Sequence, residues 1–238
     1  MAPRVQPAST QVGPSDEPRW HAAIAVVIVL GLYITLPRQF VLGPVYLAPL
    51  LVLGILLPLL IFAPSRHQES PAQRVASVAL IALINFFNVA SVALLIYSAM
   101  FAPGHVQMLA AQGAGTRLLM AGAQIWLANI LVYAMWYWEI DGGGPDPRAH
   151  ASSALEFLRA DFLFPQMMVG DERIACIEKR WKPLFLDYLF LAFTNALAFS
   201  PADTFPITRS AKVMMMAEAI TSFVTIAVVL ARAVGIVA

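Results

Sequence analysis

Long, nearly uninterrupted apolar runs recur along this chain, and they limit its possible folds more than any other feature. The clearest runs are Val75–Phe101, Leu118–Ile140 and Ala211–Val237. A helix rises about 1.5 Å per residue, so each run is long enough to cross a hydrocarbon core about 30 Å thick. Because 60% of the residues are hydrophobic and only 12% are charged, the composition also indicates a membrane protein.

Two shorter apolar runs precede these three. His21–Leu36 is followed by the sequence P-R-Q-F and not by a small-residue cleavage site, so we interpret it as an uncleaved first span. Val45–Phe62 predicts the second span. Together with Val75–Phe101 and Leu118–Ile140, these two runs predict a four-helix transmembrane region, residues 21–140. It follows a disordered tail, residues 1–20, which is rich in Pro, Ser and Gln and has no apolar period.

A polar insertion, residues 141–182, interrupts the apolar pattern. It opens with D-G-G-G-P-D-P, whose Gly and Pro residues cannot continue the preceding helix. The capping-box spacing of Ser153 and Glu156 predicts a short amphipathic helix that runs to Pro165. The rest of the chain, residues 183–238, forms the last predicted unit.

This last unit begins with an apolar segment that is short for a membrane crossing. Pro183–Phe199 gives only about 26 Å of helix, and the next segment, S-P-A-D-T-F-P-I-T, carries two prolines. Irregular backbone at membrane depth is stable only inside protein or against water. We therefore predict an all-α polytopic bundle of five spans plus one re-entrant, pore-like helix. The alternative is six spans, in which Pro183–Phe199 crosses.

The stretch from Asp187 to Thr208 reads D-Y-L-F-L-A-F-T-N-A-L-A-F-S-P-A-D-T-F-P-I-T. It resembles the pore module of potassium-channel-type tetrameric cation channels, in which D-x-L-Y-F-S-F leads into T-V-G-Y-G-D and x-x-P-x-T. The family-like positions are Asp187, Leu189, Phe190, Phe193, Asp203, Pro206 and Thr208. The same block is similar to a family of uncharacterised bacterial integral membrane proteins with a D-F-L-Y-F-x-F-T run and a later S-D. The resemblance covers only the C-terminal quarter of the chain.

The resemblance implies a pore lined by the end of the short helix and the loop that follows. The pore-like or filter-like positions are Thr194, Asn195, Ala198, Phe199, Ser200, Pro201, Ala202 and Asp203. Ser200 and Ala202 replace both filter glycines, and Pro201 replaces the tyrosine, so potassium selectivity of the family kind is not expected. What the resemblance implies is a weakly selective or non-selective pore for monovalent cations in a homotetramer.

Polar side chains also occur inside the predicted spans. Glu218 lies about ten residues into the last run, where a carboxylate costs about 2.5 to 3.5 kcal/mol unless it faces protein or water. Asn85 and Asn88 share one face of the third span, and Asn129 lies in the fourth. Two interpretations stay open for these residues: an ion pathway, or hydrogen bonds that hold helices together.

Several functional classes receive no support from the sequence. The net charge is +1, so there is no basic field for nucleic acid. Cys176 is the single cysteine and the four histidines are scattered, so we predict neither a metal nor a cofactor site. No nucleophile and base occur at a catalytic spacing, so an enzyme is not expected.

The expected partners are the bilayer of a bacterial-type inner or plasma membrane, further copies of the chain, and monovalent cations. A small-solute transporter or a non-conducting scaffold is the alternative function.

Overall fold

The computed structural model describes residues 19–62, 70–101, 114–150, 159–168, 181–198 and 204–237. These residues are mostly helical, which confirms the all-α prediction. Three helices are long and apolar enough to cross a membrane, with candidate spans Pro71–Met100, Thr116–Gly143 and Arg209–Arg232. They coincide with the three longest apolar runs and fit the prediction of a membrane protein.

The described elements follow one another as α1 (Trp20–Ile34), the 3-10 turn η1 (Arg38–Phe40), α2 (Leu47–Phe62), α3 (Pro71–Phe101), α5 (Ala114–Ile140), the 3-10 turn η2 (Asp141–Gly143), α6 (Pro145–His150), β1 (Phe162–Leu163), α8 (Pro165–Met168), α9 (Phe185–Ala198), β2 (Phe205–Pro206) and α10 (Arg209–Val237). The amphipathic helix expected to run to Pro165 does not do so, because β1 occupies Phe162–Leu163 and pairs with β2. Burial of the Phe162 ring in the core favours the extended backbone there.

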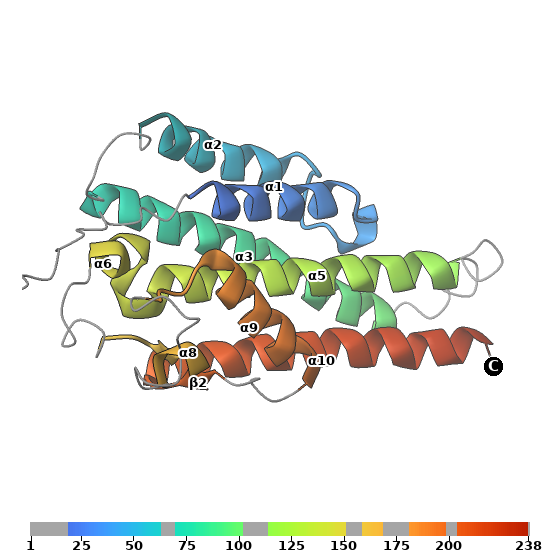
Figure 1. Cartoon of the computed structure of the whole chain (residues 1–238). Helices are drawn as coiled ribbons and strands as arrows, with labels where there is room; N and C mark the ends of the chain where they lie inside the picture. The colour runs from blue at the N-terminus through green and yellow to red at the C-terminus, as the bar shows by residue number, and fades with distance from the viewer. Residues whose placement is uncertain are drawn as a thin grey trace, which may run out of the picture.

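α5 is the central helix of the bundle. It packs against α1, α3, α9 and α10, while α2 packs on α3 (Figure 1). Small and large apolar residues alternate around α5, and Ala121, Ile130 and Val132 are each almost completely buried. Almost all residues from Ala128 to Glu139 are buried, so this half of α5 has protein on every side. The core therefore forms around α5.

The bundle has two distinct ends. At the first, which we call the α6 end, Arg19 of the α1 start, Leu60 near the end of α2, Ser77 near the start of α3 and Glu139 near the end of α5 line one cavity. At the other, which we call the η1 end, Gln124 of α5 donates a 2.9 Å hydrogen bond to Thr35 after α1. The consecutive helices α1, α2, α3 and α5 therefore alternate in direction, as short connections require.

α9 differs from the long helices because the described chain lies at the α6 end both at the start of α9 and where it resumes after α9. Its first residue, Phe185, packs its ring 6.1 Å from that of Trp138. Farther along, Asn195 reaches Glu218 of α10. The chain is again at the α6 end at Ile207, whose backbone N–H donates to Asp161 O at 2.8 Å. Figure 1 shows α9 running obliquely between α5 and α10 over part of their length.

A close approach of α5 and α10 near the η1 end depends on Gly122. A Cβ placed there would lie 2.3 Å from Val229 Cγ2, which is too close for two carbon atoms. Small residues at such positions let membrane helices pack closely. Gly122→Ala is therefore expected to lower the free energy of unfolding by about 1 to 3 kcal/mol through overpacking.

Thermal unfolding in detergent measures this effect. The matched control is Gly54→Ala, because a Cβ on Gly54 meets nothing within 4 Å and gains the same helix propensity. Equal melting temperatures for the two variants would contradict the close contact between α5 and α10.

Candidate functional site

Polar residues occur at every fourth position on one face of α5 and its end. These residues are Asn129, Tyr133, Tyr137 and Asp141, and each is at most 5% exposed. A spacing of four keeps side chains on one side of a helix. This face points toward α10, with α3 and α9 on either side, and it meets further polar residues there. We call the set Asn85, Asn88, Asn129, Tyr133, Tyr137, Asn195, Glu218, Thr221 and Ser222 the polar seam.

Glu218 is the only ionisable carboxylate of the polar seam, and it is completely buried. Its Oε2 accepts a 2.5 Å hydrogen bond from the Tyr137 hydroxyl and a 2.7 Å bond from Asn195 Nδ2. Three helices therefore meet at one carboxylate oxygen. The other oxygen, Oε1, is buried without a hydrogen-bond partner among the described residues. Two hydrogen bonds therefore fix Oε2, and Oε1 is left as an acceptor that no described residue uses.

One turn farther along α10, a second polar group joins α3, α5 and α10. Asn129 Nδ2 donates to Ser222 Oγ at 2.9 Å, and Asn129 Oδ1 accepts from Asn88 Nδ2 at 3.1 Å. All three side chains are at most 5% exposed. Because each buried amide meets a complementary group, this part of the seam avoids most of the cost of placing polar atoms in an apolar interior.

Tyr133 lies between these two groups. Its hydroxyl lies near the side chains of Thr221 and Asn85, and its ring is 6.1 Å from that of Tyr137. Asn85 retains a buried Oδ1 without a hydrogen-bond partner in the described part of the chain. The polar seam therefore extends along about two turns of α5, from Tyr137 to Asn129.

A second cluster, which we call the aspartate clasp, closes the α6 end. The Asp141 carboxylate is fully buried and accepts hydrogen bonds from the Tyr188 hydroxyl at 2.5 Å, Asp161 N at 2.6 Å and Phe162 N at 3.2 Å. Asp161 in turn accepts a 2.5 Å bond from the Thr208 hydroxyl. The clasp thereby ties the end of α5 to α9, β1 and the start of α10, and it fixes where α9 enters the bundle.

The glycines of D-G-G-G-P-D-P let the chain reverse around this clasp. Gly142, Gly143 and Gly144 have φ of 58°, 88° and 109°, a region that side chains with a Cβ rarely adopt. The reversal brings Arg148 back so that its Nη1 donates to the carbonyls of Trp138 at 2.7 Å and Asp141 at 2.5 Å. The sequence motif therefore ends α5 and caps its last carbonyls with a guanidinium group.

The structure places the predicted site residues in different surroundings. Asn195, Asn85, Asn88 and Glu218 all belong to the polar seam. Thr194 does not, because its hydroxyl donates to the carbonyls of Phe190 and Leu191 in its own helix at 2.9 and 3.0 Å. Ala198 ends α9. The remaining filter-like positions, Phe199, Ser200, Pro201, Ala202 and Asp203, lie outside the described residues.

Sequence reasoning missed Tyr137 and Asp141 as site residues. Asp141 is considered there only as the first residue of the polar insertion, and Tyr137 only as part of the apolar run Leu118–Ile140. The spacing of four that links Asn129, Tyr133, Tyr137 and Asp141 was the signal that could have revealed them. The described residues include no group of three or more His, Cys, Asp or Glu side chains that could hold a metal ion.

Comparisons with known protein families, with curated proteins and with solved structures find no match to this chain.

Proposed function

We propose that this protein is a multi-pass membrane protein that translocates a monovalent cation along the polar seam, with Glu218 as the residue that binds the ion. The observation that supports this function is the buried Glu218 carboxylate. It lies near the middle of the candidate span Arg209–Arg232, and Tyr137 and Asn195 hold it in place. Ionisable groups within membrane spans are costly and typically mark ion pathways, so their default interpretation is functional.

The charge of the polar seam favours a cation as the transported species. Its side chains include one carboxylate and no Lys or Arg. Two acceptor atoms, Glu218 Oε1 and Asn85 Oδ1, are buried without hydrogen-bond partners in the described structure. A carboxylate and oxygen acceptors without partners favour cations over anions in a narrow pathway.

The proposed membrane arrangement has five spans and a re-entrant α9. α9 has 14 residues and is therefore about 21 Å long, less than the thickness of the hydrocarbon core. The positions of Phe185 and Ile207 at the same end of the bundle support entry and return on one side of the membrane. α1 is also short, and Trp20, which is 55% exposed, is placed to anchor its start at an interface.

The pathway proposed here lies between helices of a single copy. It therefore does not require the homotetramer that the channel resemblance implies, and assembly remains a separate prediction. The mass of the purified protein in nanodiscs measures the number of copies directly.

The alternative function is a non-conducting membrane scaffold or a small-solute transporter. The mutual pairing of Asn88, Asn129 and Ser222 favours the scaffold, because these hydrogen bonds need no ion to satisfy them. In that case Glu218 would serve only as an interhelical anchor.

Ion flux into liposomes tests the proposed function. Purified protein is reconstituted, and a pH, sodium or potassium gradient is imposed while the internal ion concentration is followed with a fluorescent indicator. We expect at least one cation to equilibrate several-fold faster than in protein-free liposomes, with no increase for chloride. Rates equal to those of protein-free liposomes for all cations would contradict the proposal and favour the scaffold.

A further inference from the structure

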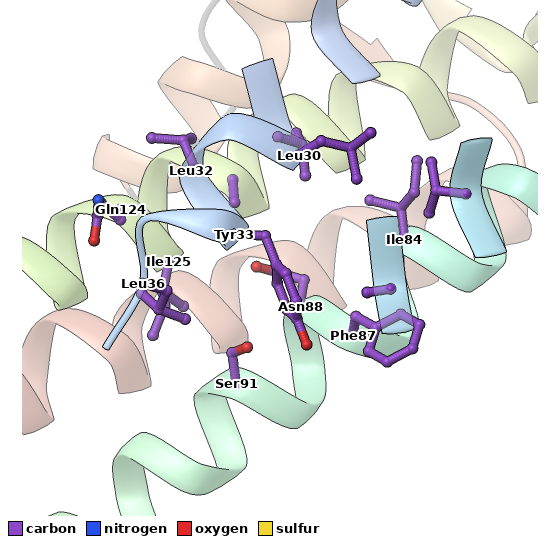
Figure 2. A pocket seen from close by; sticks show the side chains of 14 residues that line it. Leu30, Leu32, Tyr33, Leu36, Ile84, Phe87, Asn88, Ser91, Gln124 and Ile125 are labelled. Atoms are coloured by element: carbon purple, nitrogen blue, oxygen red, sulfur yellow. The ribbon is translucent and has the colours of Figure 1, made fainter. Parts of the chain in front are cut away.

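A small cavity adjoins the polar seam on the side away from α9 and α10. It measures about 30 Å³ and lies among α1, α2, α3 and α5. Figure 2 shows Tyr33, Asn88 and Ser91 around it, with Gln124 and Ile125 on the α5 wall. Asn88 also donates to Asn129 of the seam, so this side chain belongs to both the cavity and the seam.

The Ser91 side chain lines the cavity with a hydroxyl that needs a hydrogen-bond partner. The residue is 2% exposed, and its Oγ is buried without a hydrogen-bond partner among the described residues. A hydroxyl in that position costs free energy unless something bonds to it. A water molecule needs roughly 10 to 15 Å³ of such space and two or more polar partners. The cavity has room for one or two waters, and Ser91, Asn88 and Tyr33 are available as partners.

The cavity also lies between the polar seam and the η1 end. Gln124 lines it and donates a 2.9 Å hydrogen bond to the exposed Thr35 hydroxyl. Ser91, Asn88 and Gln124 therefore line one cavity, and Gln124 connects that cavity to the exposed Thr35. The amide side chains can position a water by hydrogen bonding but do not themselves carry a proton.

We propose that this cavity is a water-binding site and that the ion translocated along the seam is the proton. The second part rests on the proposed function. A cavity of about 30 Å³ admits water but not an alkali cation with its hydration shell, and its walls are mostly Leu, Val, Ile, Ala and Phe side chains, which cannot replace that shell. A proton needs only water and a group that can take it up. Glu218 becomes a carboxylic acid on accepting a proton from hydronium, which leaves water, and the reverse step restores the carboxylate.

Radiolytic hydroxyl-radical footprinting tests the water site without reference to transport, because X-rays generate radicals from bound water and label adjacent side chains. We expect labelling of Phe87 and Tyr33 in the wild type, although they are only 5% and 9% exposed. Ser91→Val fills the cavity and should reduce this labelling several-fold. Ser91→Ala, which leaves the space but removes the hydroxyl, should reduce it less and serves if the valine variant does not fold.

The matched control is Ser98→Val, because the Ser98 hydroxyl donates to Leu95 O of its own helix at 2.9 Å and does not line the cavity. Its labelling should equal that of the wild type. Absence of labelling at Phe87 and Tyr33 in the wild type would overturn the water site, whatever the result of the flux assay.

Flux in liposomes then tests the proton assignment. We expect proton flux in the wild type and in Ser98→Val, and a several-fold loss in Ser91→Val. Proton flux that is unchanged in Ser91→Val would overturn the route through the cavity while leaving the proposed function in place. Sodium or potassium flux in place of proton flux would overturn the proton assignment alone. No cation flux at all would remove the proposed function and the proton assignment, and the footprinting result would then decide the water site by itself.

Discussion

Glu218→Gln is expected to lower cation flux by about tenfold or more while leaving the protein folded. The glutamine side chain has nearly the same shape, and its amide oxygen can still accept the hydrogen bonds that Tyr137 and Asn195 donate to Oε2. What the substitution removes is the negative charge and the ability to take up a proton. The effect should therefore appear in transport and not in assembly.

The measurement is the initial flux rate in liposomes at equal protein content, together with the elution profile of the detergent-solubilised variant. Thr225→Val is the matched control, because Thr225 is also buried on α10 but donates its hydroxyl to Thr221 O of its own helix at 2.7 Å. Wild-type flux in Glu218→Gln would show that the carboxylate is a structural anchor. Tyr137→Phe, which removes one donor but no charge, should have a smaller effect on flux.

Asp141→Ala is expected to have the largest effect on stability, with a loss of about 3 to 5 kcal/mol in the free energy of unfolding. Three donors, the Tyr188 hydroxyl and the backbone N–H groups of Asp161 and Phe162, would lose their shared acceptor in a buried site. Since the clasp joins α5, α9, β1 and the start of α10, its loss should also loosen the packing of α9 against α5 and α10.

Thermal unfolding in detergent measures this change, and for a chain of this size the expected fall in melting temperature is about 10 °C or more. Asp141→Asn retains one carbonyl oxygen for the backbone donors and should cost about half as much. Tyr188→Phe removes a single donor and should cost about 1 kcal/mol. A melting temperature for Asp141→Ala within about 2 °C of the wild type would show that the clasp contributes little to stability.

Much of the helical framework could be predicted from the sequence, because apolar runs and helix-ending residues are local features. Val75–Phe101, Leu118–Ile140 and Ala211–Val237 coincide closely with the three candidate spans of the structure. The D-G-G-G-P-D-P motif correctly marks the end of α5 at Ile140. The amphipathic helix expected to reach Pro165 was wrong at its C-terminal end, because pairing of β1 with β2 is a contact between distant segments.

The polar seam could be predicted only in part. The cost of a charge in lipid already implies that Glu218 faces protein or water, and helical spacing already places Asn85 and Asn88 on one face. Neither argument identifies the groups opposite them. Tyr137 and Asn195 are separated from Glu218 by 81 and 23 residues in the chain, and their meeting depends on how α5, α9 and α10 pack.

The sequence by itself determined which segments are helices long enough to cross a membrane, and it determined that a few polar residues must be shielded from lipid. Both follow from hydropathy and from the 3.6-residue helical period, which act within one segment. Only the tertiary structure decided which polar residues meet, since hydrogen bonds such as those from Tyr188 to Asp141 and from Asn129 to Ser222 join segments far apart in the chain. It also decided how far α9 enters the bundle, because that depth is set by packing against α5 and α10 and not by the length or apolarity of the helix.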